Sequence, residues 1–165
     1  MEGPAIPVWG PALWSLFHSL AAKAGKKNGL RAGVSIEAEE KRLWRSMMLA
    51  FRSTIPCPAC QKNSNEYLIT HPLAPVLDGK QGDWGSRLRA WFYAFHNAVR
   101  SSKGQPLDFM EEQLVGYEAT LRADMVTWKQ TLTEQMRRGM VVHIVMREDM
   151  LKVLRFMEEL ILLIF

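Results

Sequence analysis

The sequence predicts an all-α protein, because apolar residues recur at helical spacing along nearly the whole chain and alternating patterns are scarce. The chain has 165 residues, of which 48% are hydrophobic, so it can form a packed core. Its formal charge is +4, and its Lys and Arg residues are dispersed, so we expect no nucleic-acid partner. No run reaches the roughly 18 apolar residues of a spanning helix, so membrane insertion is not expected.

The first two expected helices are bounded by glycine, serine and proline. Residues 11–24 place apolar side chains such as Trp14 on one helical stripe, and glycines from Gly25 onward end this helix. Ser35 is followed by acidic residues, a pattern typical of a helix start. The second helix should therefore begin there and stop before Pro56.

The next three expected helices follow the two cysteines of the chain. Pro58 occupies the position that would be the first residue of a helix, where proline is tolerated, and "THPLAP" should end that helix. A loop rich in Gly and Asp leads to a fourth helix over residues 86–102, which "KGQP" terminates. A fifth, shorter helix is expected from near Asp108.

The chain beyond Asp124 is rich in methionine and has a strongly apolar end. One or two further helices are expected, although "MVVHIVM" also suits a strand. The tail "VLRFMEELILLIF" would form a large apolar patch if it were exposed. We therefore expect it to pack on the core or to build a dimer interface.

Cys57 and Cys60 are the only cysteines and lie at an expected helix start. Unpaired N–H groups and the helix dipole stabilise a thiolate there, which favours redox chemistry. Half a zinc site and two inert buried thiols remain alternatives. A zinc site would need two more ligands, and the four histidines show no H-x₃₋₅-H pairing. A thioredoxin fold is not expected, because no strand pattern precedes the cysteines.

A dithiol that is oxidised repeatedly needs an electron acceptor, and the chain has no second cysteine pair. Trp14 and His18 lie four residues apart on one helical face, and His96 has an aromatic partner at the same spacing. Such planar groups could enclose an isoalloxazine or adenine ring, while Arg100 and Lys103 could reach a pyrophosphate. The same pattern is also typical of an ordinary helical core.

Four short motifs occur in a fixed order: G-x-x-x-W-x-x-x-H at 10–18, P-C-x-x-C at 56–60, H-P at 71–72 and W-x-x-x-x-H-N-x-V at 91–99. Together they resemble the Erv/ALR family of FAD-dependent sulfhydryl oxidases, over residues 8–117. The resemblance implies a four-to-five-helix bundle with FAD held between helices. The chain departs from the family pattern at Arg100, where the family has a second Asn, and at Gln105, where a lysine is common.

The resemblance also implies a role for each site residue. Residues 1–117 would be an FAD-binding core, and residues 118–165 an additional C-terminal helical extension for packing or dimerisation. Cys60 would react with the flavin, and Cys57 would exchange with the substrate thiol. FAD would be contacted by Gly10, Trp14, His18, Tyr93, His96, Asn97, Val99, Arg100, Lys103 and Tyr117.

We therefore expect a thiol oxidase that forms disulfides in proteins and passes electrons to FAD and then to dioxygen, releasing hydrogen peroxide. Its single redox pair is most similar to the minimal family members of large cytoplasmic DNA viruses. With no recognisable signal peptide, we expect the protein in the cytoplasm of the host cell or in the virion. The apolar tail leads us to expect a homodimer. Its substrate would be a protein dithiol such as a thioredoxin-like carrier, and no metal is expected. The alternatives are a helical zinc-binding or scaffold module without redox turnover and a purely structural interaction protein.

Overall fold

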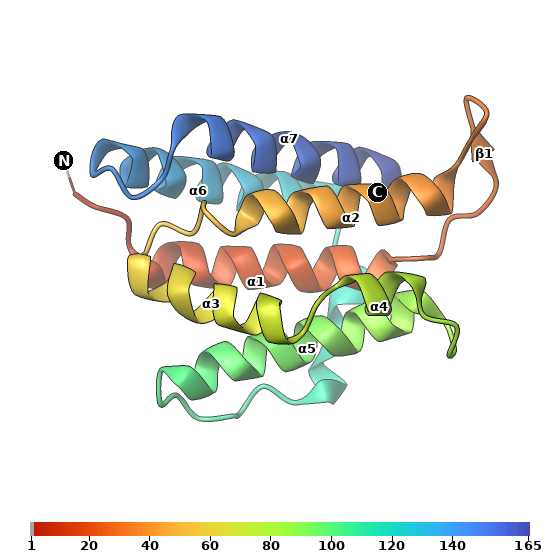
Figure 1. Cartoon of the computed structure of the whole chain (residues 1–165), viewed down its shortest axis with the longest axis horizontal. Helices are drawn as coiled ribbons and strands as arrows, with labels where there is room; N and C mark the ends of the chain where they lie inside the picture. Colours follow the sequence, from red (N-terminus) through yellow and green to blue (C-terminus); the bar gives the residue numbers. More distant parts are fainter. Residues whose placement is uncertain (1) are drawn as a thin grey trace.

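The computed structural model describes residues 2–165, and its helices form a bundle (Figure 1). A hairpin of β1 (Leu30–Arg31) and β2 (Val34–Ser35) is the only β-structure in this described part. The all-α prediction is confirmed. The helices are α1 (Ile6–Lys23), α2 (Ile36–Phe51), α3 (Pro58–Thr70), α4 (Ala74–Asp78), α5 (Trp84–Ser102), the 3₁₀ helix η1 (Glu111–Ala119), α6 (Arg122–Val141) and α7 (Arg147–Ile164).

Helix α1 lies at the centre of the bundle and contacts α5, α6, α7 and η1. Figure 1 shows α6 and α7 along one side of α1, with α3, α4 and α5 along the other. Helix α2 packs against α7. The centre of the core holds Phe17, Trp44 and Phe92, which are fully buried. Burial of such aromatic side chains is the main source of stability in a helical bundle.

Side-chain caps explain why the helices begin where they do. Ser35 Oγ accepts a hydrogen bond from the Ala38 N–H at 3.2 Å, which confirms the predicted start of α2. Cys57 occupies the N-cap of α3, and Pro58 is its first residue, as predicted. Helix α5 begins two residues earlier than expected because Asp83 is its cap.

The expected start of the first helix was wrong and one short helix was missed, in both cases at a proline, and the alternative left open for "MVVHIVM" is now decided. Helix α1 begins at Ile6 rather than residue 11. Pro7 is tolerated in its first turn because the N–H groups there have no acceptor within the helix. The short helix α4, with Pro75 near its start, was not predicted at all. The segment "MVVHIVM" is not a strand, because α6 continues to Val141 and His143 turns the chain with φ 58°.

The extension formed by α6 and α7 shares the core of the bundle. Met125, Leu132 and Met136 of α6 are buried, and so are Val153 and Met157 of α7. The end of the apolar tail packs against α2 and the core, with Leu160, Ile161, Leu163 and Ile164 buried. In the part of the chain that the structure describes, none of the helices has the length and apolar character needed to span a membrane.

Candidate redox and cofactor site

Cys57 and Cys60 are joined by a disulfide at the start of α3. The two sulfur-bearing residues differ in exposure. Cys60 is 6% exposed and belongs to the hydrophobic core, whereas Cys57 is half-buried. A thiol on another protein can therefore approach Cys57 more easily than Cys60.

The first turn of α3 also favours negative charge on Cys57. The Cys60 N–H points to Cys57 Sγ at 3.2 Å, so the sulfur takes the place of a capping oxygen. In the reduced protein this N–H and the helix dipole would stabilise a thiolate at Cys57. Cys57 can consequently act both as the attacked sulfur and as a good leaving group.

Two cavities with lining residues in common lie on the inner side of Cys60. A small one, of about 30 Å³, has Cys60, Ser64 and Phe95 among the residues of its wall. A larger one, of about 480 Å³, lies between α1, α5 and η1. The two cavities share four lining residues: Gly10, Trp14, Val99 and Lys103. A planar ligand in the larger cavity could therefore reach the neighbourhood of Cys60.

Most of the predicted cofactor residues lie around the larger cavity. The seven that line it are Gly10, Trp14, His96, Val99, Arg100, Lys103 and Tyr117. They come from helices far apart in the chain, which the fold brings together around α1. Five further lining residues were not predicted: Ile6, Pro7, Pro11, Ser15 and Gln105. Ile6 and Pro7 were missed because α1 was expected to begin later.

The imidazoles of His18 and His96 form a hydrogen-bonded pair beside this cavity. His18 Nε2 lies 2.9 Å from His96 Nδ1, and the Trp14 ring stacks on His96 with a centroid distance of 4.1 Å. Burial, followed by the proximity of His96, lowers the pKa of His18 to about 3. Burial, followed by the charge of Arg100, lowers the pKa of His96 to about 4. Both rings are therefore neutral at physiological pH.

Three of the predicted cofactor residues do not line the cavity. His18 is buried behind His96, and its Nδ1 has no hydrogen-bond partner in the described chain. The Oδ1 of Asn97 is likewise buried and unpaired among the described residues. Tyr93 faces Phe109 instead, with ring centroids 5.7 Å apart. Phe109 also packs against His18 and His96, so Tyr93 adjoins the histidine pair through this ring without lining the cavity.

The two predicted phosphate-binding cations differ in their surroundings. Arg100 pairs with Asp108, and its Nε donates to the Pro106 carbonyl at 2.9 Å. Arg100 is therefore held to the segment that follows α5, although it also lines the cavity. Lys103 has no ion pair among residues 2–165 and lines both cavities, and burial lowers its pKa.

Phe109 is a site residue that the sequence did not reveal. Its ring lies 4.8 Å from His96 and 5.0 Å from His18, between centroids, so it packs against the histidine pair. It stands in "PLDFM", a segment with no helical pattern of its own. The only available signal was that a single aromatic residue follows the helix-ending proline.

The histidines give no support to a zinc site. Across residues 2–165, no three side chains of His, Cys, Asp or Glu are grouped so that they could hold a metal ion. His71 stacks on Tyr67, with ring centroids 4.2 Å apart, and its carbonyl accepts a hydrogen bond from Trp91 Nε1 at 3.0 Å. The H-P motif thus ends α3 and fastens it to α5.

The sequence model of the Erv1/Alr family matches residues 11–118. The chain belongs to this family. The match begins within α1, ends within η1 and leaves α6 and α7 outside the matched span. No curated protein and no solved structure was found to match the chain.

The Erv1/Alr family consists of FAD-binding sulfhydryl oxidases, and the site described above fits FAD in three respects. Its larger cavity shares four lining residues with the small cavity beside Cys60 and has the size typical of ligand sites. Its wall carries planar rings and two cationic side chains, Arg100 and Lys103. Among the predicted residues, the buried Nδ1 of His18 and Oδ1 of Asn97 lack partners in the described chain, and His18 is hydrogen-bonded to His96, which lines the cavity.

Proposed function

We propose that this chain is an FAD-dependent thiol oxidase that introduces disulfides into proteins. In the overall reaction two substrate thiols and one dioxygen give a disulfide and hydrogen peroxide. The observation that carries the proposal is the position of Cys60. Cys60 is buried, and its sulfur is bonded to the more exposed Cys57. Cys60 also lines the small cavity that adjoins the larger one. This arrangement joins a protein-facing thiol to a ligand-facing one.

The two cysteines would act in succession. A substrate thiolate attacks Cys57 Sγ, the Cys57–Cys60 bond breaks, and Cys60 leaves as a thiolate. The second substrate thiolate then attacks the substrate sulfur of the mixed disulfide, which releases Cys57 and completes the substrate disulfide. Bound FAD would accept two electrons from the cysteine pair and deliver them to dioxygen. Burial of Cys60 in the core keeps water and other thiols away from its thiolate.

The remaining residues would bind and orient the cofactor. Trp14 and His96 offer flat faces for a ring system, and the neutral histidines can donate hydrogen bonds without adding positive charge. Arg100 and Lys103 are the cations available for a pyrophosphate. With this charge distribution the site would distinguish the phosphate end of the ligand from its flavin end.

The proposal extends to the partners and the setting of the protein. A chain with one redox pair has no shuttle cysteines, so a protein dithiol, such as a thioredoxin-like carrier, would react with Cys57 directly. The single redox pair is also the basis for the proposed similarity to the minimal enzymes of large cytoplasmic DNA viruses. Such an enzyme would form disulfides in the host cytoplasm or the virion.

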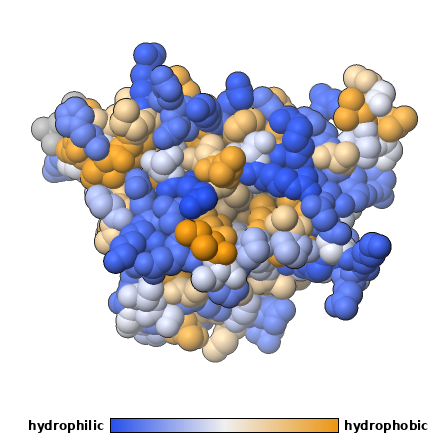
Figure 2. All heavy atoms as spheres, viewed as in Figure 1, coloured by the Kyte–Doolittle hydropathy of each residue, from blue (hydrophilic) through white to orange (hydrophobic). Residues whose placement is uncertain are grey.

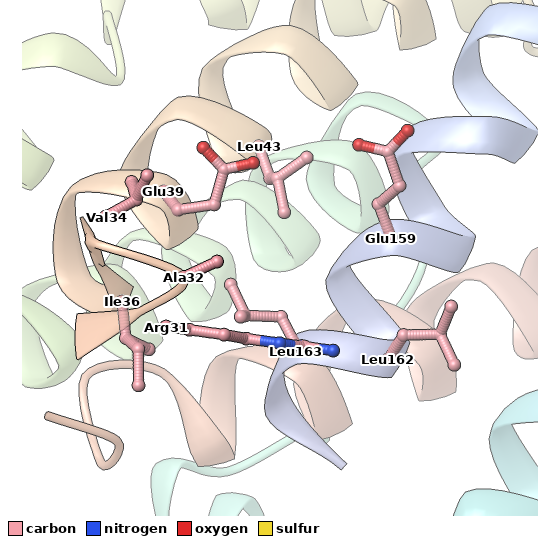
Figure 3. A pocket seen from close by; sticks show the side chains of 9 residues that line it. All are labelled: Arg31, Ala32, Val34, Ile36, Glu39, Leu43, Glu159, Leu162 and Leu163. Atoms are coloured by element: carbon pink, nitrogen blue, oxygen red, sulfur yellow. The ribbon is translucent and has the colours of Figure 1, made fainter. Parts of the chain in front are cut away.

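We also propose a homodimer through the end of the bundle that lies away from Cys57. A pocket of about 420 Å³ lies between the hairpin, α2 and α7 (Figure 3). Its wall carries both Arg31 and Glu159 beside apolar side chains, so the same surface on two copies could pair opposite charges. The nearby Leu30 is 74% exposed. Leu162→Asp should shift sedimentation from dimer to monomer, and wild-type protein that sediments as a monomer would contradict this part.

Purified protein tests the function directly. The wild type should be yellow, with a flavin spectrum, and should consume oxygen when dithiothreitol is added. Cys60→Ser should keep the bound flavin and lose turnover. A colourless protein that contains zinc would instead support the alternative of a zinc-binding or scaffold module. Wild-type oxygen consumption by Cys60→Ser would show that the role given to Cys60 is wrong.

A further inference from the structure

The turn between α6 and α7, residues 142–146, lies against the segment that precedes Cys57. A Cβ placed on Gly139 would come within 3.1 Å of Pro56 Cβ and 2.9 Å of Val145 Cγ2, so α6 and the turn pack tightly on Pro56. Gln61 of α3 donates a hydrogen bond to the Ile144 carbonyl at 3.4 Å. The extension outside the matched family span therefore forms part of the surroundings of the redox pair.

Hydrogen bonds at either side of this turn fix its position. Ser53 Oγ, on the segment between α2 and α3, donates to Asp149 Oδ2 at 2.8 Å. The Ala5 N–H donates to Gln135 Oε1 at 2.8 Å, which ties the start of α1 to α6. Figure 1 shows the starts of α1 and α3 and this turn at the same end of the bundle.

Three apolar side chains are exposed at this turn, beside the exposed His143. Val141 is 54% exposed, Val142 45% and Met146 68%, and we call these three side chains the apolar rim. Figure 2 shows hydrophobic side chains gathered at this end of the bundle. Apolar groups of this kind beside a reactive sulfur would gain from being covered when another chain arrives. Methionine adapts to partners of different shape, which suits an enzyme with several substrates.

Exposed cations accompany the apolar rim. Arg137 and Arg147 flank it along the chain, and Lys62 follows the cysteine pair in α3. None of the three forms an ion pair within residues 2–165. By contrast, Arg138 is neutralised by Glu134 at 3.2 Å. The unpaired cations would favour acidic residues in whatever chain covers the rim.

We propose that the apolar rim is the docking surface for the substrate, which is a cysteine-bearing protein segment with apolar side chains and acidic neighbours. This inference rests on the proposed oxidase function, because it concerns the partner of Cys57. A second copy of this chain is the less suitable occupant, since a copy seated on the rim would also cover the half-buried Cys57. A substrate segment must reach that sulfur, and the turn that carries the rim packs against Pro56 and Gln61 on either side of Cys57.

The test uses the full chain carrying Cys60→Ser, in which Cys57 is the only thiol. The probes are short peptides whose single cysteine is joined by a disulfide to thionitrobenzoate. Cys57 attacks the peptide sulfur, thionitrobenzoate leaves as a coloured thiolate, and the peptide becomes bonded to Cys57. One peptide has Leu, Phe and Glu around its cysteine, a second has Lys in place of Glu, and a third has Ser and Gly.

The proposal predicts that the Leu–Phe–Glu peptide reacts fastest. Val142→Ser combined with Met146→Ser should slow this peptide about tenfold and leave the Ser–Gly peptide unchanged. The matched control combines Ile69→Ser with Val115→Ser, two exposed apolar residues outside the rim, and should change neither rate. Arg137→Gln combined with Arg147→Gln should remove the preference for Glu over Lys.

Equal rates for the three peptides, or no effect of the rim substitutions, would overturn the docking proposal. This exchange needs no flavin, so it is independent of oxidase turnover. Oxygen consumption by the wild type with dithiothreitol, measured alongside, tests the oxidase function itself. A rim variant that also reacts slowly with the Ser–Gly peptide would indicate disturbed folding at Cys57. In that case the proposal is decided by the rates of the three peptides with the Cys60→Ser chain whose rim is unchanged.

Discussion

The imidazole of His18 in α1 is hydrogen-bonded to that of His96 in α5, with 2.9 Å between Nε2 and Nδ1. This bond joins two helices through residues 78 positions apart in the sequence. Trp14 covers one ring of the pair and Phe109 packs against both. Because a hydrogen bond between two imidazoles needs an unprotonated nitrogen on one of them, the pair persists only while at least one ring is neutral.

The first prediction concerns the stability of the protein in acid. In the unfolded chain both histidines bind a proton near pH 6.5, whereas the folded rings stay neutral until about pH 4 for His96 and about pH 3 for His18. The unfolded state therefore gains protons first as the pH falls. Each histidine should lower the free energy of unfolding by up to about 1.4 kcal/mol per pH unit below pH 6.5.

Urea unfolding from pH 7 to pH 4, together with the ring chemical shifts of the two histidines, checks this expectation. The prediction fails if the ring resonances of His18 and His96 titrate near pH 6.5 in the folded protein.

A second pH effect should have the opposite sign and arises at Glu40. This carboxyl is 1% exposed and accepts a hydrogen bond from the Gly25 N–H at 3.2 Å. Burial raises its pKa to about 7, from an ordinary value of 4.5. Between pH 4.5 and pH 7 the folded state therefore keeps the Glu40 proton, whereas the unfolded state has lost it. The stability that this proton contributes is complete below pH 4.5 and is lost as the pH rises through 7.

Glu40→Gln isolates this contribution, because the amide keeps the acceptor oxygen and never ionises. The variant should match the wild type in stability near pH 4.5 and exceed it at pH 8. The histidine effect is common to both proteins and cancels in the difference. Glu66→Gln makes the same change at an exposed position and serves as the control. A constant difference for Glu40→Gln across this range would contradict the assignment.

Local signals predicted the helix boundaries well where a cap is a polar residue or a cysteine. Ser35 and the Cys57–Pro58 pair each mark a helix start that the structure contains. Proline misled the prediction where it lies inside or near the start of a helix, as in α1 and α4. The ambiguity of "MVVHIVM" was resolved by tertiary packing, because Gly139 lets α6 approach Pro56 and Val145 closely.

The candidate site was predictable only in part, because its walls come from segments that no local pattern connects. Motif order indicated Trp14, His96 and Val99, which do meet around one cavity. Phe109 lies in an irregular segment, and its contact with the histidines depends on how that segment folds back after α5. Tyr93 lies at helical spacing from His96 and also packs on Phe109, but it does not line the cavity.

Glycine substitutions provide a third prediction, which separates packing from cofactor binding. A Cβ on Gly10 would meet only Ile6 Cγ2, at 3.9 Å, so Gly10→Ala should stabilise α1 by about 0.5–1 kcal/mol. Gly10 also lines both cavities, so the added methyl group should weaken flavin binding. Thermal unfolding of flavin-free protein and flavin titration measure the two effects separately.

Gly85→Ala is the matched comparison. Its Cβ would lie 2.2 Å from the Ala24 carbonyl oxygen, so the backbone of α1 or α5 would have to move. We expect a loss of about 1–3 kcal/mol in stability from this overpacking. If Gly10→Ala destabilised the flavin-free protein to the same extent, the open space assigned to Gly10 would be wrong.

The final prediction concerns the unequal reactivity of the two thiols in the reduced protein. Cys57 is the more exposed, and its sulfur receives the Cys60 N–H at the start of α3, whereas Cys60 belongs to the hydrophobic core. Iodoacetamide should therefore alkylate Cys57 at least about tenfold faster than Cys60, and at a lower pH. Mass spectrometry of peptides after brief labelling measures the ratio.

In urea the two rates should become similar, because both the helix start and the burial are lost. Faster labelling of Cys60 in the folded protein would reverse the proposed roles, since the thiol that meets the substrate would then be the one beside the cavity.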